Sequence, residues 1–211
     1  MAIDSFNISN YKKLCNNLAK LDNELRQIIL EHGHPPMFKR ESTFETLIHI
    51  ILEQQVSLAS AKAALIKLKE KIGEVTPDRI LLLTDEELRS CYFSRQKTVY
   101  ARCLATAIIG GKLNLDSLGK QHDDEIRIQL KQIKGIGDWT VDVYLMMALN
   151  RTDCFPTGDI ALMNSIKHVK QLSKHTTKEE VLLIAESWKP HRTLAAYILW
   201  WDYIKKRNMK W

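Results

Sequence analysis

The sequence predicts an all-α fold, and three observations support this. Apolar residues recur with the 3.6-residue period of a helix nearly everywhere, and sustained alternation with period 2 is almost absent. Glycine (8) and proline (5) together are about half as frequent as in an average protein, so turns are scarce. Charged residues make up 27% beside an apolar content of 45%, which excludes a disordered chain.

The expected helices follow one another without a repeat, a low-complexity tract or a long linker. A stripe of leucine and isoleucine predicts a helix over 9–32, closed by Gly33. Ser42 and Glu45 have the spacing of a capping box and open a helix over 43–53. Capping residues, proline and glycine at the boundaries predict further helices over 57–71, 77–83, 85–90, 94–109, 123–132, 138–149, 159–169, 177–187 and 190–206.

Composition and charge narrow the class of protein. The net charge of +6 resides in residues 167–211, which hold ten basic and four acidic residues. A one-sided basic end suits a polyanion such as nucleic acid, although an ordinary lysine-rich helix surface explains it equally well. No apolar run approaches the roughly 18 residues of a membrane span, and no signal peptide is recognisable at the start.

The cysteines and histidines predict no metal chemistry. The four cysteines are scattered without a CxxC pair, and the seven histidines lack metal-ligand spacing. A zinc ribbon, an iron–sulfur centre and a catalytic transition metal are therefore not expected. Free thiols are typical of a reducing compartment, so we expect a soluble cytoplasmic protein, nucleoid-associated if bacterial.

A tight hairpin between two amphipathic helices, at about 123–149, is the most informative stretch. Gly135 and Gly137 flank Ile136, an apolar residue that can hold the turn against the core. The amides from Gly135 to Asp138 begin the second helix, where N–H groups and the helix dipole favour an anion. In a helix–hairpin–helix motif this anion is a DNA phosphate, gripped without reading sequence. A simple tight connection between two helices is the alternative.

Asp159 follows a loop rich in proline and glycine and precedes an apolar helix. As an N-cap it would contribute about 1 kcal/mol to the helix. A carboxylate at a helix start can also be presented to a substrate by the loop before it. The two roles are compatible.

Together, the hairpin and Asp159 resemble the signature of the helix–hairpin–helix (HhH-GPD) DNA glycosylase superfamily, and most closely its alkylation-repair branch, 3-methyladenine DNA glycosylase II. Residues 52–57, 93–97 and 188–192 and Trp200 add to the resemblance, which covers about 40–205. It implies one compact domain over 1–211, two-lobed and helical, with the active site in the cleft between the lobes. The N-terminal β domain of some members is not expected.

The resemblance implies a monofunctional glycosylase that flips a damaged base out of duplex DNA and hydrolyses its N-glycosidic bond in base excision repair. Asp159 matches the catalytic aspartate, which stabilises positive charge on the sugar and orients water. Alkylated purines such as 3-methyladenine and 7-methylguanine are the expected substrates, because aromatic side chains favour a cationic base.

Two tryptophans match positions at the base pocket, Trp139 and Trp200, although helix core explains each about equally well. Members that also cut the strand carry a lysine at the position of Trp139. Base removal without strand cleavage is therefore expected.

The resemblance also implies DNA contacts. Gln55 matches the wedge that fills the gap left by the flipped base, with Gln54 as the second choice and an ordinary exposed turn as the alternative. Other expected DNA-binding residues are Lys134, Gly135, Ile136, Gly137, Asp138, Thr140 and Arg192. The carbonyls of Lys131, Ile133 and Gly135 match ligands of a structural Na⁺ or K⁺, no cofactor is required, and a monomer is expected.

Some positions depart from the family pattern and leave the lesion open. Asp138 stands where relatives are often basic, and Val143 and Ile160 stand where some have aromatic residues. Gly158 replaces a second acidic residue. Deaminated or oxidised bases are alternative substrates, and a non-catalytic lesion-sensing DNA-binding protein is the alternative function. Whether Trp201 and Trp211 contact DNA is also open.

Overall fold

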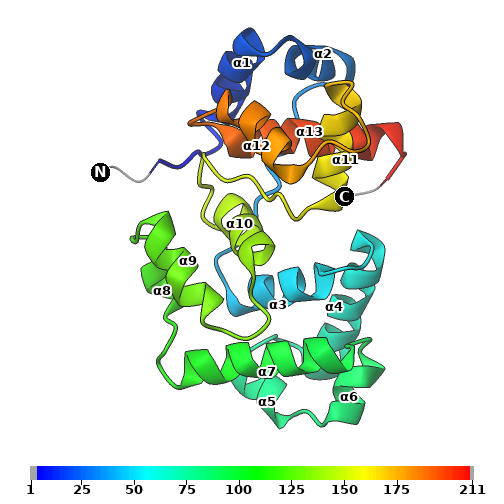
Figure 1. Cartoon of the computed structure of the whole chain (residues 1–211). Coiled ribbons are helices and arrows are strands. Elements are labelled where there is room, and N and C mark those ends of the chain that lie inside the picture. Colours follow the sequence, from blue (N-terminus) through cyan, green and yellow to red (C-terminus); the bar gives the residue numbers. More distant parts are fainter. Residues whose placement is uncertain (1–3, 210–211) are drawn as a thin grey trace. The chain divides into compact units, whose positions relative to one another are not determined.

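The computed structural model describes residues 4–209, and these are helical apart from their connections and one isolated antiparallel bridge between Ser5 and Arg151. The all-α prediction is confirmed. The helices of this part of the chain are α1 (Tyr11–Leu21), α2 (Asn23–His32), α3 (Phe44–Glu53), α4 (Leu58–Ile72), α5 (Pro77–Leu82), α6 (Asp85–Ser90), α7 (Arg95–Ile109), α8 (Leu115–Leu118), α9 (Asp123–Lys131), α10 (Asp138–Met147), α11 (Ile160–Val169), α12 (Lys178–Glu186) and α13 (Arg192–Lys206) (Figure 1).

The chain divides into two compact units. The first unit combines residues 1–39 with 145–211, and the second unit is the continuous segment 40–144. The first unit thus joins α1 and α2 to α11, α12 and α13, whereas α3 to α9 belong to the second unit. Helix α10 begins in the second unit and ends in the first.

Helix α13 forms the core of the first unit. Its residues from Leu194 to Leu199 are completely buried, which suits a helix that is apolar on nearly every face. The Tyr197 hydroxyl donates a hydrogen bond to the carbonyl of Met146 at 2.9 Å. The ring of Phe38 lies edge-on to that of Tyr197, with ring centroids 5.0 Å apart.

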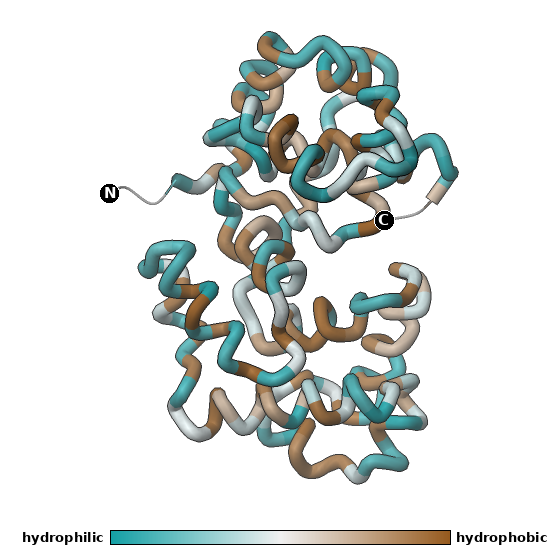
Figure 2. The backbone as a smooth tube through the Cα atoms, in the orientation of Figure 1, coloured by the Kyte–Doolittle hydropathy of each residue, from teal (hydrophilic) through white to brown (hydrophobic). Residues whose placement is uncertain are grey.

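Helix α3 forms the core of the second unit, where it packs on α4 and α7. Leu47, Ile48, Ile50 and Ile51 are completely buried, and Figure 2 shows the hydrophobic character of this helix. At its end, the buried Glu53 carboxylate accepts two hydrogen bonds from the Arg40 guanidinium, at 2.6 and 2.9 Å. This bidentate pairing compensates both charges for their loss of water.

The predicted helix over 9–32 is wrong in one respect, because it is broken at Asp22. The Asp22 carboxylate accepts a hydrogen bond from the Leu25 amide at 3.0 Å and caps α2. Its other oxygen accepts hydrogen bonds from Lys170 at 2.7 Å and from the Trp188 indole at 2.8 Å. The partners of Asp22 at the break lie 148 and 166 positions away, which local periodicity cannot reveal.

The predicted capping box of Ser42 and Glu45 is also wrong. The N-cap of α3 is Thr43, whose side chain accepts from the Thr46 amide at 3.3 Å. Ser42 instead shares a hydrogen bond of 2.8 Å with the Tyr144 hydroxyl. The short helix α8 was not predicted.

No helix among the described residues combines the length and the apolar character that crossing a bilayer requires.

Candidate active site

Asp159 lies half-buried at the N-terminus of α11, in the first unit. Its Oδ1 atom accepts a hydrogen bond from the Leu162 amide at 2.8 Å, so the residue is the N-cap of this helix. The same Oδ1 atom accepts a second hydrogen bond from the indole nitrogen of Trp200 at 3.1 Å. Two donors from different helices therefore fix the orientation of this carboxylate.

Trp200 is packed as helix core and also contacts Asp159, whereas its place at a base pocket stays a prediction. It is 8% exposed, and its ring stacks on Tyr197 with centroids 5.8 Å apart and an angle of 26° between the ring planes. The ring of Phe38 is nearly perpendicular to that of Trp200, with ring centroids 6.3 Å apart. The ring is thus packed as core, while its polar edge holds Asp159. Trp139 is half-buried in the first turn of α10, in the second unit.

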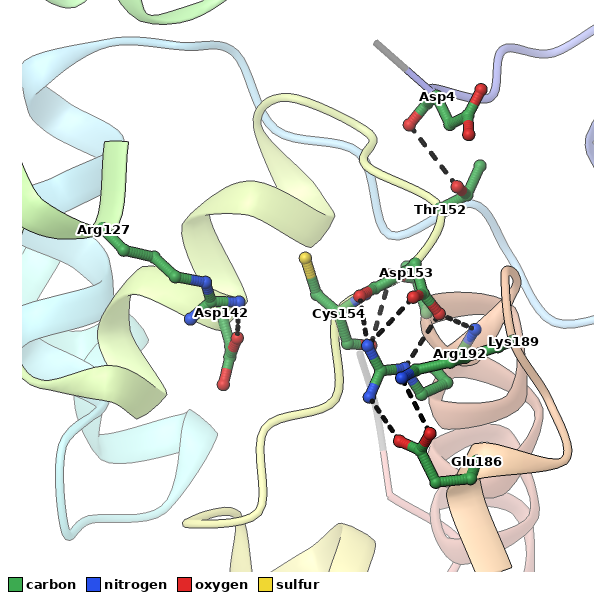
Figure 3. A network of polar contacts seen from close by, with 10 residues as sticks. Asp4, Arg127, Asp142, Thr152, Asp153, Cys154, Glu186, Lys189 and Arg192 are labelled. Atoms are coloured by element: carbon green, nitrogen blue, oxygen red, sulfur yellow. Dashed lines mark hydrogen bonds and ion pairs between the residues drawn. The ribbon is translucent and has the colours of Figure 1, made fainter. Parts of the chain in front are cut away.

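The loop that leads to Asp159 is fastened to the start of α13. The Thr193 hydroxyl accepts from the Cys154 amide at 3.0 Å and donates to the Cys154 carbonyl at 3.3 Å. Next to it, the Arg192 guanidinium bonds both carboxylate oxygens of Asp153, at 2.8 and 2.9 Å (Figure 3). These contacts fix the first part of the loop.

Arg192 was expected to contact DNA, but the structure gives it a structural role. Besides Asp153, its guanidinium meets the Glu186 carboxylate at 3.3 Å, and its side chain is only 19% exposed. Phosphate binding would compete with these ion pairs. A DNA contact by Arg192 stays a prediction.

The hairpin of the second unit is built around two buried isoleucines, Ile133 and Ile136, joined by a 3.0 Å hydrogen bond from the Ile136 amide to the Ile133 carbonyl. Gly135 has a φ of +94°, and a Cβ at this position would clash with the Tyr100 ring. Gly135 must therefore be glycine. Gly137 differs, because it lacks a positive φ and a Cβ there would meet open space. Open space at its backbone allows close approach of a partner.

Charge at the hairpin is balanced within the chain. Asp138 starts α10, and its carboxylate pairs with Lys131 at 2.6 Å, with both side chains well exposed. An exposed pair of this kind contributes little stability. It does neutralise a carboxylate that would otherwise repel a phosphate at the helix start. Lys134 is exposed on the same turn.

The two candidate wedge residues are distinguished by their contacts. The Gln54 amide donates to the Gly135 carbonyl and to the Thr140 hydroxyl, both at 2.9 Å. Gln55 is exposed, and its φ of +58° is unusual for a residue other than glycine. Of the two side chains, that of Gln55 is therefore the one open to solvent, and its role as the wedge stays a prediction. Thr140 is 2% exposed, so its hydroxyl serves Gln54, and its predicted contact with DNA has no support here.

The expected cation ligands do not form a ready site. The Gly135 carbonyl accepts the hydrogen bond from Gln54, and the Ile133 carbonyl accepts the one from Ile136. A cation at Lys131, Ile133 and Gly135 would have to share or displace both. Because a carbonyl oxygen has two lone pairs, a shared arrangement is possible, and a cation at these three residues stays a prediction.

Sequence reasoning missed the contacts of α7 and those of the last tryptophans. Lys97 donates to the Leu52 carbonyl at 2.7 Å, and burial lowers the pKa of this lysine. Tyr100 supports Gly135, as described above. The Trp201 indole donates to the His32 carbonyl at 3.1 Å, and Trp211 lies outside the described residues.

Comparison with known proteins gives consistent matches. Residues 48–191 match the model of the HhH-GPD superfamily, described as base excision DNA repair proteins. The chain is 32% identical to a putative DNA-3-methyladenine glycosylase of Bacillus subtilis over 184 residues, covering 83% of this chain and 64% of that protein. It is 31% identical to DNA-3-methyladenine glycosylase 1 of Schizosaccharomyces pombe over 191 residues, covering 87% of this chain and 84% of that one.

A solved structure is similar over nearly its whole length. It is a 3-methyladenine DNA glycosylase of Schizosaccharomyces pombe in complex with abasic DNA, with a TM-score of 0.83 and 32% identity. The alignment covers 89% of this chain and 95% of that one.

Proposed function

Since this chain belongs to the HhH-GPD superfamily of base excision DNA repair proteins, we propose that it is a DNA glycosylase that removes alkylated bases from damaged double-stranded DNA. The observation that carries the proposal is the Asp159 carboxylate, held by Leu162 and Trp200 at a helix start. The relatives named as 3-methyladenine glycosylases point to the substrate class.

Asp159 acts on the sugar. As the base departs, positive charge develops at the anomeric carbon, and an oriented carboxylate stabilises that charge. The same carboxylate orients the water that completes the hydrolysis. The donors on Oδ1 favour this role, because they fix the carboxylate before the substrate arrives, so little reorganisation accompanies the reaction.

The preferred bases are 3-methyladenine and 7-methylguanine. Both carry positive charge as nucleosides and leave readily, so no strong general acid is required. Trp139 borders the base in this proposal and offers an electron-rich face to the cation. Ile160, beside Asp159, is 75% exposed and offers apolar surface. With tryptophan rather than lysine at 139, no Schiff base forms there, so the strand remains intact.

Gln55 enters the duplex as the wedge, and the hairpin grips a phosphate through the amides of Gly135, Gly137 and Asp138, since the Ile136 amide already donates to the Ile133 carbonyl. The protein acts as a monomer without a cofactor. Its partner is duplex DNA that contains the damaged base.

The test is release of free base from methylated duplex DNA by the wild type and by Asp159→Asn. Asparagine is also a good N-cap, so the variant should keep its melting temperature. We expect the wild type to release 3-methyladenine or 7-methylguanine with strands intact before alkali, and the variant to release neither. Equal release by the two proteins would refute the role of Asp159. Duplexes with deaminated or oxidised bases, assayed in parallel, decide between lesion classes.

A further inference from the structure

The turn between α3 and α4, which carries Gln55, is tied directly to the hairpin. The side chain of Gln54 leaves this turn and donates to Gly135 in the hairpin and to Thr140 in the first turn of α10. Both donor–acceptor distances are 2.9 Å, and Thr140 is buried. One half-buried amide therefore spans two segments that are separated by more than 80 positions in the sequence.

Helix α7 is tied to the hairpin and to the last turn of α3, which leads into the Gln55 turn. Lys97 donates to the carbonyl of Leu52, in the last turn of α3, at 2.7 Å. One turn further along α7, the Tyr100 ring lies against Gly135, and Gln96 donates a hydrogen bond to the Tyr100 hydroxyl. The turn, the hairpin and α7 thus form a closed triangle of contacts within the second unit.

From this triangle we infer that Gln54 is a positioning residue for base flipping. Its amide makes the hairpin and the Gln55 turn one rigid body, so the grip of the hairpin on the DNA backbone determines where Gln55 enters the duplex. The inference rests on the proposed function. It assigns to Gln54 a role different from direct insertion into the DNA.

The conformation of Gln55 supports this role. Glutamine has a positive φ only where its surroundings enforce it. Strain held by neighbouring contacts keeps a side chain in its working position before the partner binds, so less conformational freedom is lost on binding. Without the Gln54 amide, the turn can relax, and the wedge must be ordered during flipping.

The experiment compares single-turnover base release from two duplexes. Both contain 7-methylguanine, opposite cytosine in one and opposite a tetrahydrofuran abasic analogue in the other. A base without a partner is easier to flip, so the second duplex depends less on the wedge. The proteins are the wild type, Gln54→Ala, Gln54→Glu and, as a matched control, Gln27→Ala, because Gln27 is exposed on α2.

We expect Gln54→Ala to slow release from the paired duplex about tenfold, and from the unpaired duplex less than about twofold. Gln54→Glu should behave like the alanine variant, because a carboxylate accepts and cannot donate to Gly135. Gln27→Ala should match the wild type on both duplexes. If Gln54→Ala slows base release equally on both duplexes, or on neither, the inference is wrong.

A second readout does not depend on the chemistry. 2-Aminopurine opposite a tetrahydrofuran site reports the entry of a wedge through a change in its fluorescence. Gln54→Ala should give a smaller change than the wild type at saturation, with affinity for undamaged duplex within about twofold of wild type. An unchanged fluorescence amplitude contradicts the inference. If the wild type releases no base, the proposed function fails, and the fluorescence comparison still decides the role of Gln54.

Discussion

The Asp159 carboxylate caps a helix and, in the proposed function, also stabilises the charge that develops on the sugar. The N-cap contact with Leu162 orients it along α11, and the contact with Trp200 comes from α13. The indole N–H is an expensive group to bury without a partner, so Trp200 and Asp159 satisfy each other.

Replacing Trp200 by phenylalanine separates the packing of its ring from its hydrogen bond to the Asp159 carboxylate. The smaller ring keeps most of the stacking on Tyr197 but removes the N–H donor to Asp159. A hydrogen bond to a charged group contributes about 1.5–3 kcal/mol, so single-turnover base release should slow by about one order of magnitude or more. The measurement is the rate at saturating enzyme, with the melting temperature as the check on folding.

Trp201→Phe is the matched control for this change. Its indole bonds the His32 carbonyl at 3.1 Å rather than Asp159. It should lose an indole hydrogen bond of the same length, to a neutral carbonyl, with little effect on the chemical step. If both variants slow release equally, the orienting role of Trp200 is wrong.

At the scale of the helices, local sequence signals predicted where helices start better than where a helix is broken. The helices predicted to start at about 57, 85 and 94 do start there, because their N-caps Ser57, Thr84 and Ser94 are recognisable from contacts within three residues. The break at Asp22 depends on Lys170 and Trp188, which no local pattern contains. The hairpin followed from its two glycines, but only contact with Tyr100 shows that Gly135 alone is sterically required.

The Asp22 carboxylate, at the break between α1 and α2, makes a pH-dependent contribution to the stability of the fold. Burial by itself would raise the pKa of Asp22, but hydrogen bonds from Lys170, the Leu25 amide and Trp188 outweigh it and hold the pKa below its usual value. The charged carboxylate therefore stabilises the fold above the unfolded-state pKa of about 3.9, and this contribution is lost as the pH falls through the folded-state value.

Asp22→Asn removes this contribution. We expect the variant to have a lower free energy of unfolding than the wild type at pH 7 and pH 5, by a similar amount at both. Below about pH 4 the difference should shrink, because the wild type then loses its charge at Asp22. Urea titrations at pH 7, 5 and 3 measure this. A difference that stays constant down to pH 3 contradicts the assignment.

For the whole molecule, the sequence predicted the class of fold but not how the chain ends share a core. The N-terminal helices and the C-terminal helices form one unit around α13, and the segment 40–144 forms the other. Such pairing depends on contacts across most of the chain length. Asp159 could be singled out from its loop and spacing, whereas its partner in α13 required the tertiary structure.

The tertiary structure also changes the interpretation of the basic C-terminal segment. Several of the basic residues after 167 are paired within the chain: Lys170 with Asp22, Lys189 with Glu186, Arg192 with Asp153, and Lys206 with Asp202. Fewer cations than the sequence suggests are therefore available for phosphates. The salt dependence of DNA affinity should accordingly be moderate.

We expect contacts with about three to five phosphates, which predicts a slope of log K against log salt of about −3 to −4.5. Affinity for a duplex with a tetrahydrofuran site would then fall about a hundredfold between 50 and 200 mM salt.

Lys134→Ala should reduce the slope by about one unit, because Lys134 is exposed on the hairpin. Lys170→Ala should leave the slope unchanged, because its ammonium group is held by Asp22 and Glu24 at 2.7 and 3.0 Å. Equal slopes for Lys134→Ala and the wild type would remove this residue from the phosphate contacts, and an affinity independent of salt would contradict phosphate gripping altogether.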